Sequence, residues 1–258
     1  MRRLGELTWR EAEALLAGEP IMLLPIGSTE AHGPHLPLAT DTILSEELAA
    51  RAAAALEAEG RTVVVAPALA YAITDYAADF AGTVSLSPAT ATALVDDICS
   101  SLVARGWRRV CLVNSHLEPA HVRSLEEACG RTLQRTGVAV AFADQLEKRW
   151  ARTLSDEFKR GECHAGSYET SLVLAARPEL VRDPIRRGLV VKPINLARAM
   201  REGKRTFVEA GAAEAYFGDP AAASVEEGND LYARLVAMVV ETVNAAWPAA
   251  PGADPKIG

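Results

Sequence analysis

Aromatic residues and net positive charge are both scarce in this chain of 258 residues. Phe, Trp and Tyr make up only 5% of it, so the core has to be built mainly from Val, Leu, Ile and Ala. Lys and Arg number 27 against 34 Asp and Glu, which gives a formal net charge of −7. A surface that follows nucleic-acid phosphates needs the opposite sign, so neither nucleic acid nor an anionic membrane is expected as a partner.

Paired cysteines and long apolar runs are also missing. The 4 cysteines form no C-x-x-C pair, which argues against a structural zinc clip, and we expect their thiols to be mostly buried and inert. No run approaches the ~20 apolar residues of a membrane span. No secretory apolar stretch follows Met1. These absences favour a reducing, cytoplasmic setting.

Short apolar runs alternate with helical patterns in the first part of the chain. The expected strands are "IMLLPIG", "TVVVAPAL", "RRVCLVNSH" and "VAVAFAD". A capping box at Thr8 and Glu11 starts a first helix, Asp41 is expected to cap a second that runs to about Glu59, and Ser87 caps a third. This alternation predicts an α/β fold of three layers, a mostly parallel sheet with helices on both faces.

The second half of the sequence is less regular. Helices are expected at "SYETSLVLAARPELV" and at "SVEEGNDLYARLVAMVVETVNAAW", whereas residues 183–220 mix charges with glycines and favour loops with short elements. No internal repeat and no linker indicates a second domain. We therefore expect a single domain over residues 1–248 and a flexible tail over residues 249–258.

The chain has 5 histidines, and all of them lie in three loops beside carboxylates. The loops are "PIGSTEAHGPHLPLATD", "NSHLEPAH" and "GECHAGSYETS", and the first two follow expected strands. The residues of interest are Glu30, His32, His35 and Asp41, then His116, Glu118 and His121, and last His164 and Glu169. Because open parallel sheets bind ligands at the carboxyl ends of their strands, the sequence predicts a site there.

Imidazoles and carboxylates in this pattern favour a hydrolytic centre with two metal ions. Such a centre needs neutral nitrogen ligands and carboxylates, one of which usually bridges and offsets the repulsion between the ions. Glu30 and His32 are two residues apart, so both point the same way in an extended segment, and His116 and Glu118 repeat that spacing. The five candidate ligands are Glu30, His32, Asp41, His116 and Glu118.

Three motifs resemble those of the creatininase family, which are amidohydrolases with a binuclear metal centre. Glu-x-His-Gly followed by an Asp eleven residues after the Glu is matched by Glu30, His32, Gly33 and Asp41. The Asn-x-His motif with a following Glu is matched in "NSHLE", and "HAGSYETS" matches the third motif. Gly82–Thr83 and "AYFGDPAAAS" also resemble family segments.

The resemblance implies roles for these residues. The five candidates would be metal ligands, with Asp41 bridging, and His164 would carry a proton beside the substrate. Glu118 and Glu169 complete the expected catalytic set, Glu169 by shaping or supporting the pocket. The resemblance also implies two divalent ions, most often Zn²⁺ with Mn²⁺ or Fe²⁺ as alternatives, and a homo-oligomer, commonly a hexamer.

The sequence departs from the family pattern at positions that concern the substrate. Ser115 replaces a Gly, Pro119 and His121 follow neither family form, and Cys163 stands where creatininase has a Glu. No Trp lies beside "HAGSYETS" to face a creatinine ring, so creatinine is not predicted as the substrate. The expected activity is cleavage of a C–N bond in an amide, cyclic amide or formamide of a small molecule.

Several alternatives stay open on the sequence alone. His35 either hydrogen-bonds its own loop or supports a ligand, His121 favours a surface or supporting role, and a thiolate role for Cys163 lacks a third orienting group. The basic run "RDPIRRGLVVK" is more typical of a solvated face than of a phosphate site. Alternative functions are a formamide hydrolase of a pyrimidine-type intermediate, a peptidase that trims a small precursor peptide, and a non-catalytic metal-binding assembly protein.

Overall fold

Five parallel strands form the central sheet of the computed structural model, which describes residues 1–248. Their order across the sheet is β1 (Arg2–Arg3), β3 (Val63–Val65), β2 (Ile21–Ile26), β4 (Arg109–Asn114) and β5 (Ala141–Ala143). The predicted α/β class and parallel sheet are confirmed, although β1 was not expected. The expected tail, residues 249–258, lies outside the described residues, and the single domain over 1–248 stays a prediction.

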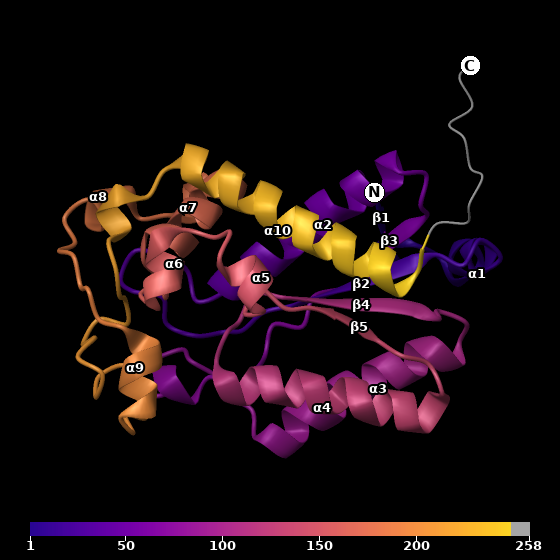
Figure 1. Cartoon of the computed structure of the whole chain (residues 1–258), viewed down its shortest axis with the longest axis horizontal. Coiled ribbons are helices and arrows are strands. Elements are labelled where there is room, and N and C mark those ends of the chain that lie inside the picture. Colours follow the sequence, from indigo (N-terminus) through magenta and orange to yellow (C-terminus); the bar gives the residue numbers. More distant parts are fainter. Residues whose placement is uncertain (249–258) are drawn as a thin grey trace.

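Helices cover both faces of the sheet, which confirms the predicted three layers (Figure 1). One face carries α2 (Thr40–Ala58), α7 (Ser167–Ala176) and α10 (Val225–Ala246), and the other carries α3 (Pro88–Ala104) and α4 (Pro119–Thr136). Along β2, Ile21 and Leu23 pack into the first core, while Met22 and Leu24 pack into the second. Because successive strand side chains point to opposite faces, a strand buried on both sides has to be continuously apolar.

Helix starts largely follow the capping residues in the sequence. Thr8 and Glu11 form the expected capping box of α1 (Trp9–Leu16), and Ser87 and Ser224 cap α3 and α10. The expectation that Asp41 caps α2 is wrong, because the helix begins at Thr40 and the cap position is Ala39. The Asp41 carboxylate is instead turned to other side chains, described below.

The topology places a crevice between β2 and β4. These strands are neighbours in the sheet, but α2 leads from β2 to β3 on one side and α4 leads from β4 to β5 on the other. Connections that leave in opposite directions open a crevice at the carboxyl ends of the two strands.

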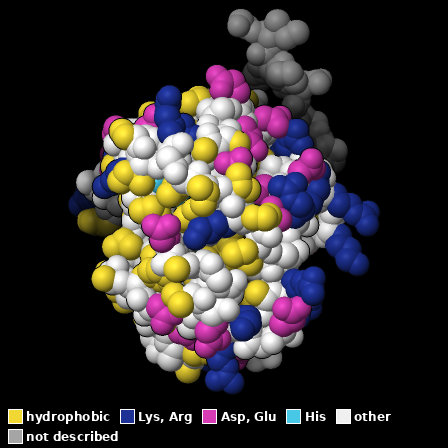
Figure 2. Space-filling model, turned by 90° about the vertical axis from the view of Figure 1, so that its left-hand side faces the viewer, with side chains coloured by type: hydrophobic (Ala, Val, Ile, Leu, Met, Phe, Trp, Pro, Cys, Tyr) yellow, Lys and Arg dark blue, Asp and Glu magenta, His cyan; other side chains and the backbone are white. Residues whose placement is uncertain are grey.

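Short helices gather at one end of the molecule, the left-hand end in Figure 1. They are α6 (Asp156–Arg160), α8 (Asp183–Arg186) and α9 (Leu196–Arg201), and α5 (Lys148–Ala151) lies between them and the sheet. The remaining short 3₁₀ elements are Leu4–Glu6, Asp75–Ala77, Pro178–Leu180 and Pro220–Ala222. Figure 2 views this end and shows hydrophobic side chains gathered over its middle. Within residues 1–248, no helix combines the length and apolarity that a membrane crossing requires.

Candidate metal centre

The predicted site residues meet at the carboxyl ends of β2 and β4. Glu30 and His32 follow β2, His116 and Glu118 follow β4, and all four are at most 7% exposed. From the other half of the chain, His164 and Glu169 lie around the start of α7 and are also buried. The structure thus brings all three predicted loops together in one crevice.

A glycine allows the first turn of α2 to pack against the end of β2. A Cβ on Gly27 would lie 2.3 Å from the backbone nitrogen of Thr42, so any larger residue would push the two segments apart. The close approach lets the Ser28 hydroxyl donate to Asp41 Oδ2 over 2.7 Å. Asp41 is held deep in the crevice as a result.

Asp41 lies between two histidines from different loops. Its Oδ2 is 2.9 Å from His116 Nδ1 and its Oδ1 is 3.2 Å from His32 Nε2. Glu30 Oε1 lies 3.4 Å from His116 Nδ1, and Glu169 Oε2 lies 3.5 Å from His32 Nε2. His116 is therefore flanked by Asp41 and Glu30, and His32 by Asp41 and Glu169, with Glu30 Oε1 also 3.7 Å from His32 Nε2.

Two groups of three ligand atoms share Asp41. They are Glu30–Asp41–His116 and His32–Asp41–Glu169, and the atoms of each lie within 4.8 Å of one another. Donor atoms about 2.1 Å from a tetrahedral zinc ion lie about 3.4 Å apart, close to the spacings observed here. Among the described residues Glu30 Oε2 has no hydrogen-bond partner although it is buried, so this carboxylate has an oxygen to spare. These donor groups fit the ligand preferences of divalent cations, and Asp41 is common to both groups.

The carboxylates strongly change the protonation of the two histidines. Burial by itself lowers the pKa of His32, but Asp41, Glu169 and Glu30 outweigh it and raise the pKa to about 10. Against the same opposing effect of burial, Glu30 and Asp41 raise the pKa of His116 well above its ordinary value. Burial raises the pKa of Glu169 to about 8, although His32 opposes the shift. The surrounding carboxylates thus stabilise the charged form of both imidazoles.

Glu169 approaches the cluster more closely than its predicted supporting role required. It lies in the first turn of α7, and its Oε2 accepts a hydrogen bond from the backbone N–H of Ala165 over 2.6 Å. The same oxygen faces His32. The geometry therefore makes Glu169 a sixth candidate ligand, which the sequence did not distinguish from a residue that lines the pocket.

Glu118 lines the pocket but belongs to none of the ligand groups found within residues 1–248. Its Oε2 accepts a hydrogen bond from the backbone N–H of Tyr76 over 3.3 Å. Burial raises the pKa of Glu118 to about 7, while the charge of His116 opposes the shift. Its predicted role as a ligand stays a prediction, and a carboxyl group with this pKa also suits proton transfer.

His164 presents one ring nitrogen to the pocket. Its Nε2 lies 3.0 Å from the carbonyl oxygen of Ala31, to which it donates, so Nδ1 carries the lone pair, 3.8 Å from Glu30 Oε1. The ring lies between His32 and Phe207, with centroids 4.4 and 4.3 Å away. Burial and the neighbouring His32 lower the pKa of His164 to about 4. The side chain is therefore neutral at pH 7 and fixed in one orientation.

His35, His121 and Cys163 lie around the site, but none belongs to a ligand group found within residues 1–248. His35 Nε2 lies 2.9 Å from the Thr170 hydroxyl, and His121 Nε2 lies 3.2 Å from Asn114 Oδ1. Asn114 in turn donates to the backbone oxygen of His116, and the His121 ring also lies 5.0 Å from the His116 ring, so His121 supports that loop both through Asn114 and directly. Burial raises the pKa of Cys163 well above its ordinary value, which argues against a thiolate nucleophile.

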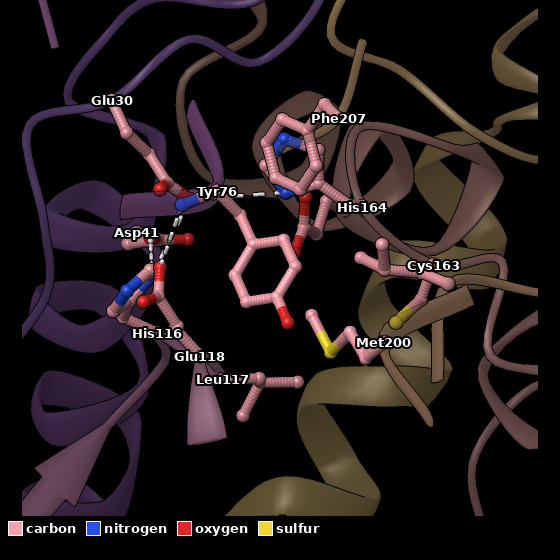
Figure 3. A pocket seen from close by; sticks show the side chains of 12 residues that line it. Glu30, Asp41, Tyr76, His116, Leu117, Glu118, Cys163, His164, Met200 and Phe207 are labelled. Carbon is pink, nitrogen blue, oxygen red and sulfur yellow. Dashed lines mark hydrogen bonds and ion pairs between the residues drawn. The ribbon is translucent and has the colours of Figure 1, made fainter. Parts of the chain in front are cut away.

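Several pocket residues carried no signal in the sequence. Figure 3 shows Glu30, Asp41 and His116 grouped on one side of the pocket, with Met200 and Cys163 on the other. The lining residues that the sequence did not indicate are Tyr76, Leu117, Leu196, Met200 and Phe207. Tyr76 lies in the 3₁₀ turn Asp75–Ala77 and Leu117 in the loop after β4, while the other three lie in α9 and the loop that follows it. None of these segments has a periodic pattern in the sequence.

Comparison with known proteins agrees with this geometry. The Creatininase family model, described as creatinine amidohydrolase, matches residues 5–243. The chain belongs to the creatininase family. A curated relative from Mycobacterium tuberculosis, named mycofactocin precursor peptide peptidase, is 32% identical over 255 residues and covers 96% of this chain and 93% of its own length.

Two further relatives bear the family's own name. Creatinine amidohydrolase from Pseudomonas putida is 33% identical over 196 residues, which cover 69% of this chain and 72% of the relative. A solved structure described as creatininase Mn has a TM-score of 0.73 at 27% identity, and covers 96% of this chain and 99% of its own. The family assignment and the fold expected from the motifs are thus confirmed, and this chain is a hydrolase of that family.

Proposed function

We propose that this hydrolase cleaves a C–N bond of an amide, cyclic amide or formamide in a small molecule with two bound divalent metal ions. The observation that carries the proposal is the position of Asp41, whose two oxygens face His116 and His32 separately. Glu30 and Glu169 complete the two ligand sets. Two cations held there would lower the pKa of a bound water into the neutral range and polarise the scissile carbonyl.

The protein side chains handle the protons of this reaction. The lone pair of His164 Nδ1 faces the pocket, where it accepts a proton and delivers it to the leaving nitrogen, a poor leaving group as an anion. Glu118 lies in the same pocket and is able to exchange a proton near neutral pH. The apolar walls formed by Phe207 and Met200 limit access of bulk water.

The donor set supports Zn²⁺, with Mn²⁺ or Fe²⁺ as alternatives. Oxygen and imidazole ligands suit all three ions, whereas a thiolate ligand would have restricted the choice of metal ion more strongly. The neighbouring structure described as creatininase Mn supports manganese as one occupant of such a site.

Elemental analysis and a substrate screen test the proposal together. Protein purified without chelators is expected to hold two divalent ions per chain and to hydrolyse at least one member of a panel of amides, lactams and formamides. His32→Ala is expected to lose metal and activity together, whereas Glu226→Gln, on the exposed part of α10, is expected to change neither. A protein that holds both metals yet hydrolyses nothing, peptides included, would support the non-catalytic assembly protein instead.

A second candidate function, peptidase, is favoured by a groove that continues from the pocket. Leu117, Cys163, Leu196 and Met200 line both spaces. Beyond them the groove runs between α6 and α9, and the side chains that line only the groove are Pro119, Leu146, Phe158, Lys159, Gly161, Asn195, Ala197 and Arg201. A small molecule does not need this length, whereas an extended peptide does. The relatives named as peptidases support the same candidate.

Assembly into a homo-oligomer, a hexamer by family resemblance, is part of the proposal. Val190 and Val191 are 69% and 56% exposed, and adjacent exposed valines are typical of a surface that another subunit covers. Light scattering on Val191→Glu is expected to show a smaller particle than on the unmodified protein. The cytoplasmic location stays a prediction from the sequence.

A further inference from the structure

We infer that Glu157 of α6 is a positioning residue for the metal centre: its carboxylate caps α7 from outside the helix and so holds Glu169 against His32. The inference rests on the proposed function, because it assigns Glu169 to one of the two metal sites. Glu157 itself does not line the pocket that holds the ligand cluster. It acts through the helix that carries Glu169.

The Glu157 side chain is buried and accepts three backbone hydrogen bonds. Its Oε1 accepts from the N–H of Tyr168 over 2.9 Å, and its Oε2 accepts from Ser167 over 3.0 Å and from Asp219 over 2.8 Å. Only 5% of the residue is exposed. Burial of the carboxylate raises its pKa, and these N–H groups oppose that shift.

The amino end of α7 depends on this external carboxylate. The first N–H groups of a helix have no partner within the helix, and a side chain at the cap position usually supplies one. The cap position of α7 is Gly166, which has no side chain to offer. Glu157 replaces the missing cap and places a negative charge at the positive end of the helix.

Two glycines leave room for the carboxylate. A Cβ on Gly166 would lie 2.3 Å from Glu157 Oε1, and a Cβ on Gly218 would lie 2.1 Å from Oε2. Gly166 has a φ of −86°, a conformation open to any residue, so the carboxylate and not the backbone requires glycine there. The space for the Glu157 carboxylate is therefore built by glycines of two segments, "HAGSYETS" and "AYFGDPAAAS".

Through these hydrogen bonds, the Glu157 carboxylate connects the first turn of α7 with the segments that position Glu169 and His164. Glu169 directly follows Tyr168, and its Oε2 faces His32 at 3.5 Å. Asp219 lies two residues after Phe217, whose N–H donates to the backbone oxygen of His164 over 3.0 Å. Loss of the Glu157 hydrogen bonds frees the turn that aims Glu169.

Glu157→Gln tests the inference with little change in shape. The new amide group puts an N–H₂ donor against backbone N–H donors, so the first turn of α7 has to move. Partners that orient metal ligands typically affect metal affinity about 10- to 100-fold, so we expect a loss of that size at one site. The affected site is His32–Asp41–Glu169, whereas Glu30–Asp41–His116 keeps its affinity.

Titration of the metal-free protein with Zn²⁺ is the measurement. In the unmodified protein we expect two binding steps, and Glu169→Gln identifies the step to which Glu169 contributes. Glu157→Gln is expected to lower the zinc affinity of that same step. When it is combined with Glu169→Gln, it is expected to lower the affinity by less than a further factor of about three. Asp156→Asn is the matched control, because this neighbouring carboxylate is exposed and its ion pair within residues 1–248 is with the adjacent Lys159 on the surface of α6.

Gly166→Ala is the second variant, and it decides the question if Glu157→Gln does not fold. It keeps the carboxylate but displaces it, so it is expected to weaken the same zinc step. Equal weakening of both steps, or full additivity with Glu169→Gln, means a general structural role and overturns the inference. Two unchanged steps in both variants overturn it as well, while the proposed function stands. No zinc binding by the unmodified protein overturns the proposed function and this inference together.

Discussion

His116 Nδ1 lies 2.9 Å from Asp41 Oδ2, which leaves the other oxygen of the same carboxylate to face His32. One side chain thereby joins loops that follow two different strands. Such an arrangement couples the two candidate metal sites, because neither group of ligands is complete without Asp41. The coupling makes the effects of single substitutions unequal in a predictable way.

Asp41→Asn is expected to remove both metal ions. An amide nitrogen is no metal ligand, so the substitution leaves one usable oxygen for two cations. His116→Ala and Glu169→Gln each affect one group and are expected to leave about one ion per chain. Elemental analysis measures these counts, with Asp230→Asn on the exposed face of α10 as the control. Retention of both ions by Asp41→Asn would contradict a bridging role.

Parts of this site were predictable because they follow from strand geometry. The apolar runs of β2 and β4 are recognisable as buried strands, and parallel strands place the loops that follow their carboxyl ends at the same edge of the sheet. The position of Glu169 was not predictable in this way. It depends on the start of α7, which is fixed by Glu157 from another helix.

The pocket walls were also beyond reach of the sequence. Tyr76 lies in a single 3₁₀ turn and Phe207 in a loop, and neither belongs to a periodic pattern. Their positions are set by tertiary contacts, such as the hydrogen bond from the Phe207 N–H to the Tyr76 carbonyl. For Asp41, the local capping rules predicted a helix cap, whereas its carboxylate contacts His116 and His32 in the crevice.

Metal binding is expected to release protons. In the metal-free protein the pKa of His32 is raised to about 10 and that of His116 well above its ordinary value, so both are protonated at pH 7. A metal ligand has to be a neutral imidazole, so each binding event displaces a proton. Affinity therefore rises with pH, up to about 10 for the site of His32.

Calorimetric titration with Zn²⁺ in buffers of different ionisation enthalpy counts these protons. We expect about three per chain at pH 7, two from the histidines and one from Glu169, whose pKa is raised to about 8, and fewer in His32→Ala. A binding enthalpy that does not depend on the buffer would show that the histidines are already neutral.

His164→Ala is expected to lower kcat by about 10²- to 10⁴-fold, the usual contribution of a proton-transfer group. Its Nε2 is held by the Ala31 carbonyl, which leaves Nδ1 on the pocket side, where the proposed mechanism needs a proton acceptor. Both metal ions are expected to remain. His121→Ala is the comparison histidine: it does not line the pocket, and it contacts the site through Asn114 and through the His116 ring, whose centroid lies 5.0 Å away. Loss of a metal ion in His164→Ala would make His164 a ligand with Glu30 and His32, a grouping that the geometry also permits.

Glu118→Gln separates proton transfer from metal ligation. Burial raises the pKa of Glu118 to about 7 in the metal-free protein, and nearby cations are expected to lower it again. In the unmodified enzyme, activity is then expected to fall at a pH clearly below 7, where the carboxylate with its lowered pKa takes up a proton. The pH dependence of kcat/KM is expected to lose this acidic limb in Glu118→Gln, at unchanged metal content. A drop in metal content would favour the ligand role that the sequence predicted.

The groove beside the pocket distinguishes a peptidase from a hydrolase of small amides. Ala197 on α9 lines the groove but not the pocket, and it is exposed, so Ala197→Trp fills the groove without strain in the core. Remote contacts of a long substrate contribute binding energy that a small substrate lacks. We therefore expect kcat/KM for extended peptides to fall about tenfold or more, while hydrolysis of small amides is unchanged. Ala213→Trp, at another exposed alanine, is the control for the added bulk. If peptide hydrolysis by Ala197→Trp equals that of the unmodified protein, the groove has no part in substrate binding and the assignment returns to small molecules.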